Sequence, residues 1–259
     1  MFFACSIPFS LRFLCVLQSF KFIFSGSPLP GARACLIKTI FPPDCNFDII
    51  KSLENVNLGK KINRIKDNIK IKYFIMNLNL NSLNNKIIKC RACPRLIKFR
   101  KKIVKNKRKQ FKNEVYWGKP ITGFGDPLGK ILFVGLAPAA HGGTRTGRVF
   151  TGDKSSDFLY KCLFKAKISN QSTSDHINDG LKLKNAFITP ALKCVPPEDK
   201  PLKTELENCS KFFNNELNIL KNLKVVVALG KIAFDTCKIF YSEKFDISNE
   251  VQFGHGKTF

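Results

Sequence analysis

The chain has 259 residues and carries 44 lysines and arginines against 19 aspartates and glutamates, which gives a formal net charge of +25. Its hydrophobic content of 44% is enough to build a core, and this excludes disorder throughout the chain. A compact protein with so much positive charge repels itself unless a polyanion shares its surface, so nucleic acid is the expected partner.

The first part of the chain, residues 1–75, differs in character from the rest. Its apolar stretch, residues 2–24, is interrupted by a proline and two cations, which does not suit a membrane-spanning helix. A small-residue pattern at residues 32–34 leaves a cleaved signal peptide open, although the charged start of such a peptide is missing. We expect a poorly packed extension or mis-assigned upstream sequence, with Met76 as the natural beginning of one domain over residues 76–259.

A strongly basic run follows at residues 86–112, with thirteen lysines or arginines and no acidic residue. Such a run is either a solvated helix face or a surface that contacts phosphates. Because it adjoins a pair of cysteines, we favour the second interpretation. Arg95, Lys98 and Arg100 are the candidate DNA contacts.

Three short apolar runs then alternate with segments of helical spacing. The runs are residues 131–136, 186–189 and 225–229, and the helical segments lie around residues 158–163 and 212–220. Continuous apolar runs are typical of strands buried on both faces. The order predicts a parallel sheet covered by helices on both sides, with ligands beyond the carboxyl ends of its strands.

A long loop of small residues, 135–153, begins at the end of the first of these strands and is too long for a simple connection. Arg145 and Arg148 in this loop offer cations for phosphates, and Phe150 offers an aromatic ring for stacking. Asp153 offers a carboxylate that can orient a water molecule. Arginines interleaved with an aromatic ring suit a base extruded from a helix, whereas the glycine patterns of a nucleotide-binding loop are absent from the sequence.

Four of the ten cysteines form a pattern that points to metal or cluster ligation before disulfides. Two stand in a CxxC pair, and the other two are fifteen residues apart: Cys90, Cys93, Cys194 and Cys209. This spacing is unlike a compact zinc ribbon, but spacing alone leaves zinc and an iron–sulfur cluster open. The other cysteines, Cys162 and Cys237 among them, are expected to be small buried hydrophobic residues.

Seven motifs in fixed order make the chain resemble a known family between Cys90 and His255. They are CRACPRL from Cys90, YWG from Tyr116, GFGDP from Gly123, the loop 135–153, KCVPP from Lys193, VALG from Val227 and FGHG from Phe253. With these motifs the chain resembles the type b, or family 5, uracil-DNA glycosylases, the iron–sulfur branch of the uracil-DNA glycosylase superfamily.

The resemblance implies a three-layer α/β/α sandwich with a central parallel sheet. It implies an enzyme of base-excision repair that hydrolyses the N-glycosidic bond of uracil, with other deaminated bases as further candidates, after the base is flipped out of DNA. The expected partner is double-stranded DNA containing uracil, with no membrane, and we expect a monomer in the cytoplasm, associated with the nucleoid. A four-iron four-sulfur cluster, rather than zinc, is implied as the cofactor of the four patterned cysteines.

The resemblance also implies roles for residues of the long loop. Asp153 would position the attacking water and offset the positive charge that develops on the sugar. Phe150 would stack on the base, and His141 would hydrogen-bond the base or a phosphate. The backbone from Gly135 to Ala140, including Ala137 and Ala139, would line the base pocket.

Two departures from the family pattern affect the expected activity. The position that reads the pyrimidine edge in related enzymes is Pro190, and the substitute contact is Asp199, which accepts but does not donate when ionised. Family members also continue past the FGHG motif to a strand, a His-Pro-Ser loop and a final helix. We therefore expect a sheet that lacks its last strand and helix, with a catalytically impaired iron–sulfur nucleic-acid-binding protein or fragment as the alternative function.

Overall fold

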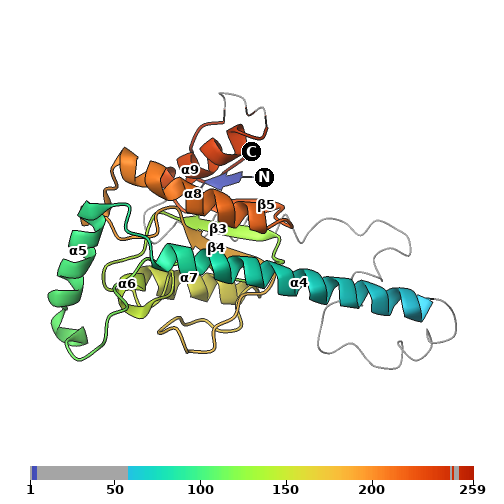
Figure 1. Ribbon diagram of the computed structural model, residues 1–259, viewed down its shortest axis with the longest axis horizontal. Helices are drawn as coiled ribbons and strands as arrows, with labels where there is room; N and C mark the ends of the chain where they lie inside the picture. Colours follow the sequence, from blue (N-terminus) through green and yellow to red (C-terminus); the bar gives the residue numbers. More distant parts are fainter. Residues whose placement is uncertain (1, 5–57, 246, 248–250) are drawn as a thin grey trace.

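The computed structural model describes residues 2–4, 58–245, 247 and 251–259 (Figure 1). The strands are β1 (Phe2–Ala4), β2 (Phe124–Gly125), β3 (Ile131–Gly135), β4 (Ala186–Pro190), β5 (Val225–Ala228) and β6 (Lys257–Thr258). The helices are α4 (Leu58–Ile88), α5 (Pro94–Lys105), α6 (Gly143–Thr146), α7 (Lys154–Lys165), α8 (Lys203–Ile219) and α9 (Lys231–Ser242), with short 3-10 turns at Lys109–Phe111 and Pro197–Asp199.

The strands form one sheet in the order β2-β4-β3-β5-β1-β6. Its centre is parallel, as predicted, because β3 pairs in parallel with both β4 and β5. The two outer strands run the other way, since β2 is antiparallel to β4 and β6 is antiparallel to β1. The parallel pairing predicted for the three apolar runs is therefore confirmed, and antiparallel strands extend the sheet at both edges.

Alternate side chains of the central strands enter two separate cores. Ile131 and Phe133 of β3 lie in a core with Leu159 and Leu163 of α7. Leu132, the residue between them, lies in the opposite core. This second core contains residues of α4, α8 and α9, including Leu80, Phe213, Leu217, Phe234 and Phe240. Burial of both faces explains the continuous apolar runs and confirms the predicted α/β architecture with helices on each side.

Helix α4 extends far beyond the sheet, with its first turns at one end of the molecule (Figure 1). It begins at Leu58, inside the stretch that the sequence marked as an extension, and Met76 is a buried residue within it. Residues 5–57, which include most of the candidate signal peptide, lie outside the described residues. In the part of the chain described, none of the helices combines the length and the apolar character needed to cross a bilayer.

One edge of the sheet is built differently from the expectation. The sequence left the position beyond β5 without a strand, but β1 pairs there in parallel, with Phe3 opposite Val227. The short strand β6 then pairs with β1. The two described ends of the chain thus lie together at this edge.

The carboxyl ends of the central strands bring together two segments that contain candidate site residues. Gly135 at the end of β3 is in register with Pro190 at the end of β4. The pairing continues past the strands, because the amide of Ala191 donates to the carbonyl of Gly135 over 2.8 Å. The long loop that follows β3 and the cysteine-containing segment that follows β4 therefore start side by side.

Candidate functional site

The ring of Phe150 lies directly against the backbone of Gly135. A Cβ atom added at Gly135 would stand 2.6 Å from the tip of this ring, so only glycine leaves room for it. Phe150 itself has a φ of 48°, a left-handed conformation that is rare for a bulky side chain. Strain of this kind persists only where the surrounding structure enforces it, and it gathers at functional sites.

Asp153 is the N-cap of α7, and its two carboxylate oxygens have different surroundings. Oδ1 accepts from the amide of Ser156 at 2.9 Å and from the hydroxyl of Ser155. Oδ2 lies against the backbone of Gly142, where a side chain would collide with it, and makes no hydrogen bond within the described residues. The cap thus fixes the carboxylate through one oxygen and leaves the other as an acceptor.

His141 is held by a phenol. Its Nδ1 lies 2.9 Å from the hydroxyl of Tyr116, and the two rings meet edge to face. Burial, together with the charges of Arg108 and Arg145, lowers the pKa of His141 from its ordinary value of 6.5. The imidazole is therefore neutral at pH 7 and offers one donor and one acceptor.

The two arginines of the loop, which were expected to contact phosphates, are directed into the protein. Arg145 is buried and binds Glu114 at 2.5 Å, the carbonyl of His141 at 2.7 Å and that of Gly152 at 2.9 Å. Arg148 is buried too, with both terminal nitrogens bound to Asp179. This corrects the expectation that these side chains contact DNA phosphates, because internal partners already occupy their donors.

The long loop is backed by the segment Tyr116–Gly118. The amide of Trp117 donates to the carbonyl of Arg145 over 2.9 Å, and the amide of Gly118 donates to that of Thr144 over 3.0 Å. Trp117 is half-buried and its indole lies against Gly147, where a Cβ would come within 3.2 Å of the ring. The YWG motif therefore supports the middle of the loop.

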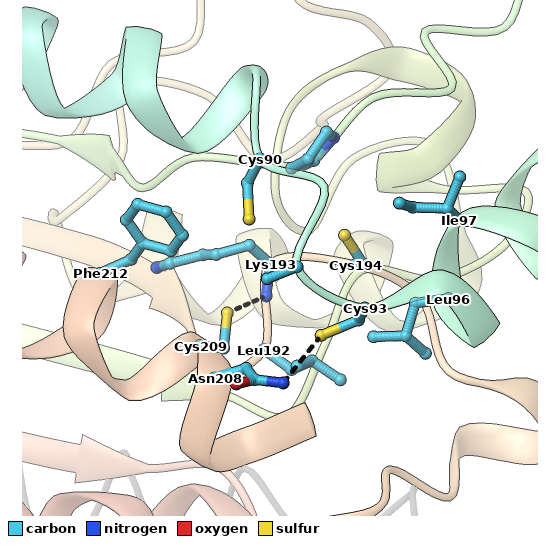
Figure 2. A pocket seen from close by; sticks show the side chains of 12 residues that line it. Cys90, Cys93, Leu96, Ile97, Leu192, Lys193, Cys194, Asn208, Cys209 and Phe212 are labelled. Atoms are coloured by element: carbon cyan, nitrogen blue, oxygen red, sulfur yellow. Dashed lines mark hydrogen bonds between the residues drawn. The ribbon is translucent and has the colours of Figure 1, made fainter. Parts of the chain in front are cut away.

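All four patterned cysteines line a single hollow, with sulfur atoms around it in Figure 2. Cys90 follows α4, Cys93 is the N-cap of α5, Cys194 follows β4 and Cys209 lies within α8. None of the described cysteines is in a disulfide in this structure. Among the described His, Cys, Asp and Glu side chains, no three come together closely enough to hold a single metal ion. The thiols thus surround a space instead of converging on one point.

Each of these thiols except Cys90 has a donor beside it. Arg100 donates to Sγ of Cys194 over 2.9 Å, the amide of Lys193 donates to Sγ of Cys209 over 3.3 Å, and Asn208 is 3.9 Å from Sγ of Cys93. Burial raises the pKa of Cys194 to about 12 and that of Cys209 to about 11, although Arg100 and Lys193 act in the opposite direction. Donors aimed at sulfur stabilise the anionic form that a metal requires.

Helix α5 presents a row of exposed cations. Lys98 is exposed, as expected for a DNA contact, and so are the neighbouring lysines Lys101, Lys102 and Lys105. Arg95 instead forms a two-pronged pair with Glu205, with distances of 2.8 and 2.9 Å. Arg100 is buried behind Cys194. Arg100 therefore has an internal role, which corrects its expected phosphate contact, whereas Arg95 is exposed and its expected contact with DNA stays a prediction.

The cysteine hollow adjoins the long loop. Ala137 packs against the small core that contains Leu96 of α5, Leu192 and Cys209, together with Cys93 and Cys194. Ala139 is half-buried, and its carbonyl accepts from the amide of Thr144 over 3.0 Å. Asp199 is exposed at the end of the turn Pro197–Asp199, with a left-handed φ of 56°. The loop backbone and the thiols thus share one packed region, whereas Asp199 stands at its surface.

A buried ion pair behind this region was not identified from the sequence. Nζ of Lys193 lies 2.5 Å from Oε2 of Glu216, and both side chains are almost fully buried. The same lysine donates to the hydroxyl of Thr189 and to the carbonyl of Pro190. The pair ties the segment that follows β4, which contains Cys194, to helix α8, which contains Cys209. Lys193 and Glu216 are 23 residues apart, and no pattern in the sequence indicates that they are in contact.

Comparison with known proteins gives this site a family context. Residues 122–258 match the family model described as the uracil DNA glycosylase superfamily. A protein of Thermus thermophilus named type-5 uracil-DNA glycosylase is 47% identical over 146 residues, which cover 56% of this chain and 66% of the relative. Proteins of the same name from Pyrobaculum aerophilum and Mycobacterium leprae are each 41% identical, over 58% and 60% of this chain and 65% and 69% of the relative. The match thus spans slightly less than two thirds of the first two relatives.

Proposed function

Because the chain belongs to the uracil-DNA glycosylase superfamily, we propose that it excises uracil from DNA by hydrolysing the bond between the base and the sugar. The observation that carries the proposal is that an aromatic ring and a carboxylate lie in the same loop at the carboxyl edge of the sheet. The ring of Phe150 lies against Gly135, and the carboxylate of Asp153 lies against Gly142. Relatives named type-5 uracil-DNA glycosylase support the choice of uracil.

In the proposed reaction, the bond between C1′ and N1 of a flipped deoxyuridine breaks and its electron pair stays with the base. Oδ2 of Asp153 accepts a hydrogen bond from a water molecule and offsets the positive charge that develops on the sugar. The water oxygen bonds to C1′, its proton passes to the carboxylate or solvent, and the uracil anion takes up a proton at N1. The products are free uracil and an abasic site.

The proposed base pocket is formed by the start and the end of the long loop. Phe150 stacks on the flipped base, and the backbone of Gly135, Ala137 and Ala139 lines the pocket. Neutral His141 hydrogen-bonds the base or a phosphate. We assign Asp199 to the rim, where its exposure and left-handed backbone suit a contact made as the base enters.

The proposed DNA surface is the exposed face of α5, the face formed by Lys98, Lys101, Lys102 and Lys105. Flexible lysines at a solvated surface suit the sequence-independent phosphate contacts that hold a duplex while one base is extruded. A cost of a few kcal/mol for unstacking the base is least at a mispair such as uracil opposite guanine. Mispaired uracil in a duplex is therefore the proposed substrate.

We further propose that Cys90, Cys93, Cys194 and Cys209 hold a four-iron four-sulfur cluster. A zinc ion needs its sulfur ligands about 2.3 Å from one point, which requires closer convergence than these thiols have. A cluster takes its thiolates at separate iron atoms, so a hollow ringed by four sulfurs suits it better. Such a cluster would supply structural ties, joining α5 to β4 and α8 next to the loop.

The direct test is release of the base. Purified protein is incubated with a synthetic duplex that contains one uracil opposite guanine, and free uracil is measured by mass spectrometry, with a thymine duplex as the control. We expect uracil from the first duplex and no thymine from the second. Tight, salt-dependent binding of both duplexes with no release from either would instead indicate a nucleic-acid-binding protein without glycosylase activity.

A further inference from the structure

A hydrogen-bond network beneath the long loop contains none of the residues that take part in the proposed reaction. It consists of Arg148, Thr151, Ser174 and Asp179, of which the first three are nearly inaccessible to solvent. The carboxylate of Asp179 is only 7% exposed. The loop supplies Arg148 and Thr151, and the segment before β4 supplies the other two.

The network begins at a two-pronged ion pair. Nη1 and Nη2 of Arg148 donate to the two oxygens of Asp179 over 2.8 and 2.6 Å. Asp179 also accepts from the backbone amides of Asp175 and Leu181, so it fixes the turn that carries it. Bidentate pairs of this kind define orientation as well as distance.

The network then reaches the backbone on both sides of Thr151. Nη2 of Arg148 donates to the hydroxyl of Ser174 over 3.0 Å, and that hydroxyl donates to the carbonyl of Phe150 over 3.0 Å. The amide of Gly152 donates to the carbonyl of Ser174 over 2.8 Å. Ser174 therefore holds the residue before Thr151 and the residue after it.

These two contacts act where the loop is strained. Phe150 has a left-handed φ of 48°, and Asp153 follows Gly152 directly. Only contacts that over-determine the backbone keep a phenylalanine in this conformation. Release of the Phe150 carbonyl would let the ring leave Gly135 and shift the cap that aims Asp153.

We infer that Ser174, held by Arg148 and Asp179, is a positioning residue that sets the ring of Phe150 and the carboxylate of Asp153 for base excision. The inference rests on the proposed function, because it assigns the network to that same site. It predicts that loss of the Ser174 hydroxyl impairs base recognition while the fold and general DNA binding persist.

The test uses Ser174→Ala, with Ser169→Ala as the matched control. Ser169 is also buried and donates its hydroxyl to a backbone carbonyl, that of Gln171, but has no bond to the loop. Single-turnover uracil release from a U:G duplex should fall by roughly 10- to 100-fold in Ser174→Ala and stay unchanged in Ser169→Ala, because small misplacements of reacting groups are costly.

A second readout is independent of turnover. Binding is measured to a duplex with a non-cleavable 2′-fluorodeoxyuridine and to the same duplex with thymidine. The parent should prefer the fluorinated duplex, and Ser174→Ala should lose that preference while binding thymidine duplex as the parent does. Fluorescence of Trp117, the one tryptophan in the sequence, reports loop packing in the same samples.

The outcomes separate the two proposals. Parental rate and preference in a folded Ser174→Ala would overturn the inference and leave the glycosylase intact. A parent without release and without preference would contradict the proposed function itself. If Ser174→Ala does not fold, Arg148→Lys replaces it, because lysine keeps the charge but not the two-pronged pair; the inference then requires the same loss of rate and preference in this variant.

Discussion

Two glycines define the space in which the chemistry is proposed to occur. Gly135 admits the ring of Phe150, and Gly142 admits a carboxylate oxygen of Asp153. In each case the missing side chain allows close approach, although the backbone at neither position has a left-handed φ. The positions of the two candidate side chains thus depend on glycines to which no chemical role is assigned.

Gly135→Ala should lower uracil excision by at least about 10-fold, because overpacking beside Phe150 costs about 1–3 kcal/mol and moves the ring. The measurement is the single-turnover rate on a U:G duplex. In a Phe150→Ala background the same substitution should have little further effect, since its steric partner is gone. Equal losses in both backgrounds would show that Gly135 acts through something other than this ring.

The misassigned arginines show why residue roles in a loop are hard to predict. Arg145 and Arg148 have the same sequence character whether they face phosphate or an internal carboxylate. The partner of Arg148, Asp179, is 31 residues away in a turn without periodicity. The resemblance already implied that Phe150, Asp153 and His141 belong to one site, but the close contacts of Phe150 with Gly135 and of Asp153 with Gly142 became visible only in the structure.

At the scale of elements, the four cysteines connect three pieces of the fold. Cys90 and Cys93 flank the turn from α4 into α5. Cys194 follows β4, and Cys209 lies in α8. The contact of Arg95 with Glu205 joins the starts of α5 and α8 at the same place. A ligand shared by all four thiols would therefore fix the basic helix relative to the sheet.

Cys90→Ala should abolish stoichiometric iron and weaken the attachment of α5. Iron and sulfide content, visible absorbance and hydrogen exchange of α5 are measured on anaerobically purified protein. Cys162→Ala is the control, because this buried thiol on α7 lies outside the hollow and should leave iron content unchanged. Parental protein that binds one zinc ion and is colourless would contradict the cluster.

Replacing Lys101, Lys102 and Lys105 of α5 by glutamine should weaken binding to any duplex and make it less dependent on salt. Removal of one phosphate-binding cation reduces the slope of log K against log salt by about 0.9, so a change of up to about 3 is expected for the three lysines. Glutamines at the exposed Lys161, Lys165 and Lys184 form a control of equal charge change. An equal change of slope in the control would show that α5 is not the DNA surface.

At the scale of the whole molecule, the central apolar strands of the sheet were predictable from the sequence, and the strands at its edges were not. β3, β4 and β5 are buried on both faces, so their residues form continuous apolar runs that mark them in the sequence. β1, β2 and β6 have only two or three residues, too few for any periodicity. Their pairing depends on tertiary contacts, and the antiparallel edges were therefore missed.

The stability of the molecule should depend on Asp179 in acid. Burial opposes its ionisation, but hydrogen bonds from Arg148 and from backbone amides outweigh burial and lower its pKa to about 2. A lowered carboxylate pKa stabilises the fold above the unfolded value of 3.8 and loses this contribution as the pH falls through about 2. The shift corresponds to about 2 kcal/mol.

Urea unfolding of parent and Asp179→Asn should therefore give a difference in unfolding free energy that is constant near neutral pH and shrinks between pH 4 and pH 2. The comparison isolates Asp179 because other carboxylates titrate alike in both proteins. A difference that does not change over this interval would show that the ion pair with Arg148 does not govern the response.

The most direct test of the proposed chemistry is the single-turnover rate of uracil release by Asp153→Asn. Asparagine is as good an N-cap as aspartate, so α7 should stay capped while the negative charge is lost. We predict normal thermal stability, normal duplex binding and a rate lower than that of the parent by about 10²-fold or more. Release of uracil at the parental rate by this variant would contradict the assignment of Asp153, and with it the role proposed for the loop.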